Sequence, residues 1–107
     1  VGVHAGDHYI YPDCRPAFIE SMAWAVSLGS GDLVSLVTPF LNITKADILA
    51  VGKGIGVPYQ LTRTCYADQS VACGKCGSCQ ERLESFQKNG IEDPLNYESR
   101  ELVARGT

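Results

Sequence analysis

Apolar and polar positions along the chain follow patterns that predict strands and helices in turn. Residues 1–5, "VGVHA", start with β-branched side chains and predict the end of a strand. Residues 15–29 carry apolar side chains at helical spacing, with Pro16 in the first turn and Gly29 as the stop. Residues 32–41, "DLVSLVTPFL", form a nearly continuous apolar run, which is typical of a strand covered on both faces. We expect the helix to pack on the resulting sheet.

Two further helices are predicted in the rest of the chain. Residues 44–58 open with Thr44 as an N-cap and end in a series of glycines before Pro58. Another helix follows the S-x-x-E capping box that begins at Ser78, and Gly90 provides its stop. The order strand, helix, strand, helix predicts a parallel α/β sheet followed by a helical C-terminal region.

Composition and charge narrow the class of protein. At 107 residues, the chain is expected to be one small domain or part of a larger one. It has no apolar run near the roughly 20 residues that span a bilayer, so no membrane segment is predicted. The nine Lys and Arg residues are scattered and the formal net charge is −3, which gives no cationic face for a nucleic acid. The N-terminus lacks a starting Met and the features of a secretory signal, so we expect a true start upstream and a reducing, cytoplasmic location.

Four cysteines in fifteen positions are the strongest chemical motif. They follow the pattern C-x7-C-x2-C-x2-C and are Cys65, Cys73, Cys76 and Cys79. This spacing brings four thiolates within reach of one tetrahedral ion, because a CxxC step turns the chain back on itself and directs amide N–H groups at sulfur. A closed site of four thiolates leaves no position for water or substrate, so we expect one structural zinc ion per chain.

Two alternatives to a zinc site stay open for these cysteines. Three cysteines at two-residue spacing also occur in iron–sulfur proteins, although the fourth ligand there usually precedes a proline or lies far away. Four unrelated buried thiols are the second alternative. Disulfides are disfavoured, because the total of five cysteines is odd and a CxxC disulfide is short and strained.

Several segments resemble the 7-cyano-7-deazaguanine synthases of queuosine biosynthesis, a tRNA modification pathway. The segments "YPDCRPAF", "TKADILAVGKGIGVP", "TCY" and "CGKCGSCQERLESFQKNGIEDPLNY" occur in the same order as in that family, and the resemblance covers nearly the whole chain. It implies the C-terminal part of a doubly wound parallel sheet, with the Rossmann-like fold of the adenine nucleotide α-hydrolases. It also implies that zinc binds to the four clustered cysteines.

The resemblance further implies an ATP-dependent carbon–nitrogen ligase. Such an enzyme converts 7-carboxy-7-deazaguanine and ammonia into 7-cyano-7-deazaguanine, through adenylation, an amide and a second activation that leads to dehydration. An adenylate supplies the leaving group that a carboxylate lacks, while magnesium and cationic side chains hold the phosphate charge. No catalytic residue can be identified from the sequence.

The chain departs from the family at the phosphate-binding loop. Family members carry an SGGxDS-type loop between the first strand and a helix, and we find none here. The segment "SLGSGD", residues 27–32, precedes an apolar run instead of following it, and "VGKGIG", residues 51–56, ends a helix. We therefore expect the C-terminal half of a synthase, with residues 1–64 in the α/β domain and residues 65–107 in the zinc-binding and helical region. This half is expected to be inactive without the missing N-terminal half, and a homodimer is one option for its assembly.

The substrate candidates lie in the loop "HAGDHYIYPDCR", which follows the first predicted strand at its carboxyl end, where open α/β sheets bind ligands. Asp7 and Asp13 could pair with the ring N–H and amino donors of a deazaguanine, Arg15 could hold a carboxylate or a phosphate, and Tyr11 could stack on the heterocycle. A local alternative for Asp13 is to cap the following helix. Lys45 lies in the first turn of a predicted helix, where a cation is electrostatically misplaced, so it is expected either to contact phosphate or to be a solvated surface lysine.

A non-enzymatic zinc module that contacts RNA or protein is the competing hypothesis. It is motivated by the small size, the four thiols and the missing phosphate loop. The acidic balance and the few exposed aromatic candidates argue against RNA. Turnover of ATP after the missing half is supplied would separate the two hypotheses.

Overall fold

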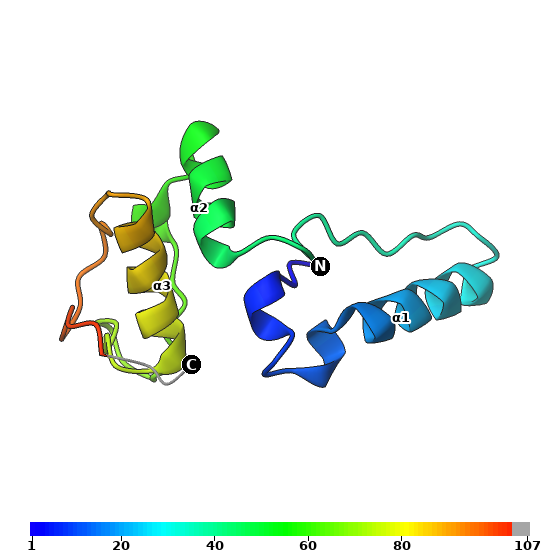
Figure 1. The fold of residues 1–107 in the computed structure, drawn as a ribbon, viewed down its shortest axis with the longest axis horizontal. Helices are drawn as coiled ribbons and strands as arrows, with labels where there is room; N and C mark the ends of the chain where they lie inside the picture. Colours follow the sequence, from blue (N-terminus) through cyan, green and yellow to red (C-terminus); the bar gives the residue numbers. More distant parts are fainter. Residues whose placement is uncertain (104–107) are drawn as a thin grey trace. The chain divides into compact units, whose positions relative to one another are not determined.

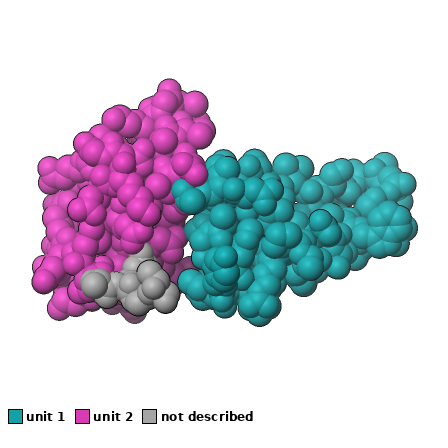
Figure 2. All heavy atoms as spheres, in the orientation of Figure 1, with its two compact units in different colours: residues 1–44 teal, residues 45–107 magenta. Residues whose placement is uncertain are grey.

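The structure, a computed structural model, describes residues 1–103. The chain divides into two compact units, unit 1 with residues 1–44 and unit 2 with residues 45–107 (Figure 2). The described residues form three α-helices, joined by irregular segments and short 3₁₀ turns (Figure 1): α1 (Pro16–Gly29), α2 (Lys45–Gly54) and α3 (Gly77–Lys88). None of the described helices has the length and apolar character needed to cross a membrane. The division between the units follows residue 44 and so lies ahead of the predicted domain boundary, which follows residue 64. The assignment of functional domains stays a prediction.

Unit 1 is built around α1, whose position confirms the predicted helix. Pro16 occupies the first helical position, and Arg15 is the N-cap, without a side-chain hydrogen bond. The helix ends at Gly29, and the chain then turns through Gly31 and Asp32, which have left-handed φ angles of 61° and 65°. The turn therefore depends on the conformational freedom of Gly31. Gly29, the predicted stop, is itself the last residue of the helix.

The predicted sheet is not formed by the described residues. Residues 1–3 and 34–38 have no regular secondary structure, and the described chain contains one isolated parallel bridge, between Ala72 and Tyr97. At the start of the second predicted strand, Leu33 is 89% exposed. A strand needs a neighbour that pairs with its N–H and C=O groups, and the described part of the chain offers none to these segments. The prediction of a parallel sheet is thus not confirmed.

Most of the large apolar side chains of α1 are exposed. Ile19 is the buried residue of this helix, with 7% of its surface exposed. Trp24 and Leu28 are 68% and 63% exposed, and Phe18 and Met22 are also open to solvent. The helix thus presents the kind of surface that packs on a sheet, while the described residues of unit 1 supply no sheet to cover it.

In unit 2, α2 packs against α3 (Figure 1). It begins directly after Thr44, as predicted, and it ends in a Schellman motif, in which the Val57 N–H donates to the Gly52 carbonyl at 2.9 Å. Gly56 provides the left-handed turn of this motif, with a φ of 78°. Gly52 also allows Tyr59 to approach the helix, because a Cβ at this glycine would lie 1.9 Å from the tyrosine hydroxyl oxygen.

The N-terminus of α3 is capped by a cysteine and not by the predicted serine. Cys76 is the N-cap, and its Sγ accepts a hydrogen bond from the Cys79 N–H at 3.4 Å. Ser78 therefore lies inside the first turn, because sulfur takes the place of the serine oxygen in the capping geometry. At the other end, Gly90 follows the helix with a φ of 66°, which confirms the predicted glycine stop.

A buried ion pair fixes the segment that follows α3. Arg82 donates to the Asp93 carboxylate through Nε at 2.7 Å and through Nη2 at 3.0 Å. The Tyr97 hydroxyl donates to the same carboxylate at 2.5 Å. Residues 91–103 form no helix, so within the described part the helical C-terminal region consists of α3 alone. Residues 104–107, the end of the region predicted to be helical, lie outside the described residues.

Candidate metal centre

The four predicted metal ligands converge in unit 2. The Sγ atoms of Cys65, Cys73, Cys76 and Cys79 all lie within 4.8 Å of one another. The first and the last of them are buried, and the other two are partly buried. All five cysteines of the chain, including the distant Cys14, are free thiols. The structure therefore brings together the four residues that the sequence spacing groups.

The sulfur separations fit a tetrahedral ion. Four sulfur atoms at about 2.3 Å from a zinc ion lie about 3.8 Å from one another. The Cys73 Sγ lies 3.7 Å from the Cys65 Sγ and 4.0 Å from the Cys79 Sγ. A disulfide would require a separation of about 2.05 Å, so these pairs are not bonded to each other. The four cysteines could thus hold one metal ion in a closed site.

Backbone N–H groups surround the sulfur atoms. The amides of Ala67 and Cys73 each donate to the Cys65 Sγ at 3.4 Å. The amides of Lys75 and Cys76 donate to the Cys73 Sγ at 3.4 and 3.3 Å. Such bonds stabilise negative charge on sulfur, and the thiolate is the form that binds a metal. The turns therefore prepare these cysteines for metal binding.

The surroundings favour the thiolate at three of the four positions. The Cys73 N–H makes the largest contribution that lowers the pKa of Cys65, and the Lys75 N–H lowers the pKa of Cys73 in the same way. At Cys76, burial opposes ionisation, but hydrogen bonds, first of all from the Cys79 N–H, outweigh it and lower the pKa. Burial raises the pKa of Cys79 to about 12. Metal binding at this last thiol therefore displaces a proton.

Arg63 shapes the loop between the first two cysteines, a role that the sequence pattern does not reveal. Its guanidinium donates to three carbonyl oxygens of this loop, those of Cys65 at 3.1 Å, Ala67 at 2.7 Å and Ser70 at 3.4 Å. The rigid fork of five N–H donors suits such a task, because several acceptors can be bound at once. The loop therefore has a fixed shape although it lies at the surface.

Among the predicted substrate residues, Asp7 and Arg15 already have partners within unit 1. Asp7 ends the 3₁₀ turn η1 (Ala5–Asp7), and its Oδ2 lies 3.1 Å from Nε2 of the buried His4. Arg15 donates through Nε to the His8 carbonyl at 2.9 Å. These contacts fix the loop ahead of α1. The role of His4 in this loop is not visible in the sequence pattern, which offers only a histidine three residues ahead of an aspartate.

The other two substrate candidates are exposed. Tyr11 is the N-cap of the 3₁₀ turn η2 (Pro12–Cys14) and is 51% exposed. Asp13 lies inside this turn and is also exposed. The alternative that Asp13 caps the following helix is wrong, because the N-cap of α1 is Arg15 and no side chain caps that end. Contact of these residues with a substrate stays a prediction.

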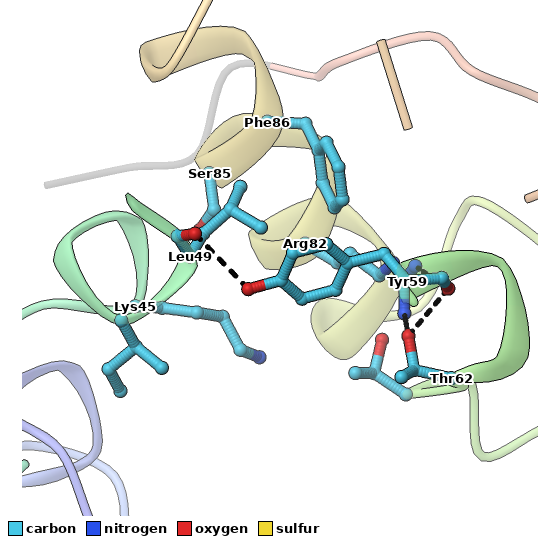
Figure 3. A pocket seen from close by; sticks show the side chains of 9 residues that line it. Lys45, Leu49, Tyr59, Thr62, Arg82, Ser85 and Phe86 are labelled. Atoms are coloured by element: carbon cyan, nitrogen blue, oxygen red, sulfur yellow. Dashed lines mark hydrogen bonds between the residues drawn. The ribbon is translucent and has the colours of Figure 1, made fainter. Parts of the chain in front are cut away.

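Lys45 lies in the first turn of α2 and lines a cavity of unit 2 (Figure 3). The cavity measures about 190 Å³ and has largely apolar walls, which include Leu49, Tyr59 and Phe86. The tyrosine hydroxyl donates to the Leu49 carbonyl at 3.1 Å (Figure 3). The lysine Nζ lies 3.1 Å from the Glu81 carboxylate. This ion pair offsets the unfavourable position of a cation at a helix N-terminus, and the phosphate contact stays a prediction.

Comparison with known proteins gives one consistent family. The family model described as "Queuosine biosynthesis protein QueC" matches residues 1–90, which include the four clustered cysteines. The 7-cyano-7-deazaguanine synthase of Pseudoalteromonas atlantica is 54% identical over 97 residues, which are 91% of this chain and 44% of the relative. The synthase of Hahella chejuensis is 54% identical over 98 residues, 92% of this chain and 42% of the relative. The synthase of Caldicellulosiruptor saccharolyticus is 48% identical over 97 residues, 91% of this chain and 43% of the relative.

No solved structure matches the chain. The chain spans less than half the length of the curated relatives that it matches. Since the family model covers most of the chain, and relatives named for one activity match nearly all of it, the chain belongs to the queuosine biosynthesis protein QueC family.

Proposed function

We propose that the chain is the C-terminal part of an ATP-dependent 7-cyano-7-deazaguanine synthase and acts in queuosine biosynthesis. The observation that carries this proposal is the identity of about half of the residues, over 91% of the chain, to relatives with that name. The chain matches 43% to 44% of their length, so we assign the ATP-binding loop to the remaining part of the enzyme.

The proposed reaction converts a carboxylate into a nitrile, with ammonia as the source of nitrogen. Transfer of AMP from ATP to a carboxylate oxygen releases pyrophosphate and gives a leaving group, which ammonia displaces to form the amide. Transfer of a second AMP to the amide oxygen, followed by loss of AMP and two protons, gives the nitrile. Both oxygens of the carboxylate therefore leave on AMP. Magnesium and cationic side chains would offset the phosphate charge.

The four-cysteine cluster is proposed to hold one structural zinc ion. Three features support this choice: the sulfur separations, the N–H groups directed at sulfur and the lowered pKa values of three thiols. A closed site gives zinc no open position for substrate, so the ion would act by fixing the turns and the start of α3. Zinc binding can contribute on the order of 10 kcal/mol to folding, which is comparable to the stability of a whole domain.

Unit 1 is proposed to complete a doubly wound parallel sheet together with the N-terminal part of the enzyme. The exposed apolar side chains of α1 and of the segment after it support this proposal, since Trp24, Leu28 and Leu33 would otherwise stay in water. A reducing, cytoplasmic location is proposed because all five cysteines are free thiols.

The ligand contacts are proposed as the sequence predicts them. Asp7, Tyr11, Asp13 and Arg15 would contact the deazaguanine, and their loop presents exposed side chains that a substrate can reach. Lys45 would contact a phosphate group, which would compete with the carboxylate that now pairs with its ammonium. A phosphate can do so because it carries more negative charge and offers more acceptor oxygens.

The test joins this chain to the N-terminal part of the Pseudoalteromonas atlantica synthase that precedes the matched region. The hybrid protein, loaded with zinc, is incubated with 7-carboxy-7-deazaguanine, ammonium, ATP and magnesium, and mass spectrometry follows the nitrile and AMP. We expect both products from the hybrid and neither from either part alone. A folded, zinc-loaded hybrid that makes no AMP, amide or nitrile, while the intact relative does so in the same assay, would overturn the proposal.

The role of Lys45 is tested in the same hybrid with a matched control. Lys45→Gln should raise the KM for ATP about 10- to 100-fold, because it removes a charge-assisted hydrogen bond to phosphate. Lys53→Gln changes an exposed lysine in the last turn of the same helix and should leave the KM unchanged. Equal effects of the two substitutions would contradict the phosphate contact.

A further inference from the structure

Gln80 is a buried polar residue of α3 that links the metal-binding turn to the C-terminal segment. It is 3% exposed. Its Nε2 donates to the Gly74 carbonyl at 2.7 Å and to the Glu101 carbonyl at 2.7 Å, and its Oε1 accepts a bond from the Val103 N–H at 2.9 Å. One side chain therefore satisfies three backbone groups, of which the first belongs to the turn after Cys73 and the other two to the end of the described chain.

The C-terminal segment also lies directly against the same turn. The Glu98 N–H donates to the Ala72 carbonyl at 2.9 Å, and Ala72 forms the isolated parallel bridge with Tyr97. Gly74 has a φ of 75° and lies so close to this segment that a Cβ would be 1.6 Å from the Ser99 carbonyl oxygen. All these contacts involve the turn that carries the second of the four cysteines.

The shape of this turn depends on what the cysteines bind. An ion bound by all four sulfur atoms would tie the turn that carries Cys73 to the other three cysteines, and loss of that ion would leave the turn free to move. Movement of the Gly74 carbonyl would break its bond to the Gln80 amide and disturb the two bonds that the same amide makes with the C-terminal segment. Metal binding and docking of the segment are therefore linked through one side chain.

We propose that Gln80 is a positioning residue that couples metal binding at the four cysteines to the docking of residues 97–103. Coupling between two binding events is reciprocal, so the docked segment must strengthen metal binding by the same factor by which the metal strengthens docking. Gln80 touches neither the ion nor a reacting atom in this scheme. It acts by holding the turn that presents Cys73 and by anchoring the segment that covers this turn.

The test compares two substitutions in α3 of the full chain. Gln80→Met keeps the length of the side chain but removes its hydrogen bonds, and Gln87→Met makes the same change at an exposed position of the same helix. Each protein is loaded with zinc, and transfer of the ion to the chromophoric chelator 4-(2-pyridylazo)resorcinol is timed. We expect zinc release about 10- to 100-fold faster from Gln80→Met, as for other residues that orient metal ligands, and a change within about twofold for the control.

Two further measurements separate coupling from general loss of structure. In Gln80→Met, the cobalt-substituted protein should keep the absorption bands of tetrahedral sulfur ligation, while the Val103 and Glu98 amides exchange with solvent at least about tenfold faster. Zinc release at the rate of the unchanged chain would overturn the proposal. If Gln80→Met does not fold with zinc, a chain that lacks residues 101–107 provides the test instead. This shortened chain removes two of the three partners of Gln80, and it should therefore also release zinc faster. Unchanged release from that shortened chain would equally overturn the proposal.

Discussion

Asp93 and Arg82 form a buried ion pair, and removal of its negative charge should destabilise unit 2 strongly. Their side chains are 0% and 6% exposed. Asp93→Asn keeps the volume of the side chain but leaves the guanidinium without a counterion. The single carbonyl oxygen of Asn also cannot replace the carboxylate, which accepts two bonds from Arg82, one from the Leu95 N–H and one from the Tyr97 hydroxyl.

The size of the effect follows from the burial of the pair. Removal of one partner of a buried ion pair destabilises a protein by about 3–5 kcal/mol, because the remaining charge stays away from water. A matched control lies on α3, where Glu84 and Lys88 form a pair at 3.0 Å with side chains that are 37% and 62% exposed. Exposed helix pairs of this kind contribute about 0.3–0.5 kcal/mol, so Glu84→Gln should have little effect.

Urea unfolding of the zinc-loaded chain measures both losses. The signal has to come from unit 2, because the single tryptophan, Trp24, lies in unit 1. Amide exchange of α3 meets this requirement. A double variant with Arg82→Met isolates the energy of the pair, since that substitution removes the charge that Asp93→Asn leaves unpaired. A loss of less than about 1 kcal/mol for Asp93→Asn, or additive losses in the double variant, would refute the reasoning.

Four other outcomes are expected. A strong chelator should unfold α3 by removing on the order of 10 kcal/mol of folding free energy, and unchanged melting after complete demetallation would contradict the zinc proposal. Gly74→Ala should lower the free energy of unfolding in urea by more than about 2 kcal/mol, because residue 74 has a left-handed φ and its new Cβ would clash with the Ser99 carbonyl oxygen. A smaller loss would count against this close contact. Gly52→Ala should destabilise unit 2, because the added Cβ clashes with the Tyr59 hydroxyl. Tyr59→Phe removes this hydroxyl and should reduce the loss of stability that Gly52→Ala causes. An equal loss with and without the hydroxyl would contradict the clash. Burial alone would raise the pKa of Asp93, but the hydrogen bonds that its carboxylate accepts outweigh burial and lower it. Its contribution is therefore complete above the unfolded pKa of about 3.9 and is lost as the pH falls through the folded value, so the stability difference from Asp93→Asn should shrink in acid and not grow.

Local patterns in the sequence predict the helices and the metal ligands. A Pro at the start and helical spacing of apolar residues place α1, and the glycine after α3 marks its end, because these signals act within a few residues of where they occur. The cysteine spacing predicts the cluster for the same reason, since a CxxC step closes on itself. The cap of α3 is missed because Cys76 takes a position usually held by an oxygen side chain.

Contacts between distant parts of the chain are not predictable in this way. Arg82 and Asp93 are both charged residues in a polar stretch, and nothing in their neighbourhood in sequence distinguishes them from surface residues. The bonds that Gln80 makes with the C-terminal segment have no local signature either. The predicted sheet is not confirmed for a different reason, because the apolar run in residues 32–41 fits a strand but the described chain has no neighbour for it.

The sulfur of Cys76 caps α3 and also belongs to the four-cysteine cluster, so an ion bound there would fix the rotation of α3 about its axis. One residue added between Cys76 and Cys79 would turn the rest of the helix by about 100° about its axis and carry the buried arginine away from its aspartate. One residue added between Cys65 and Cys73 would disturb the loop whose carbonyl oxygens Arg63 binds, but it would not change the phase of α3 relative to Cys76. The spacing between Cys76 and Cys79 thus sets the rotation of α3 about its axis, whereas the spacing between Cys65 and Cys73 sets only the shape of a loop.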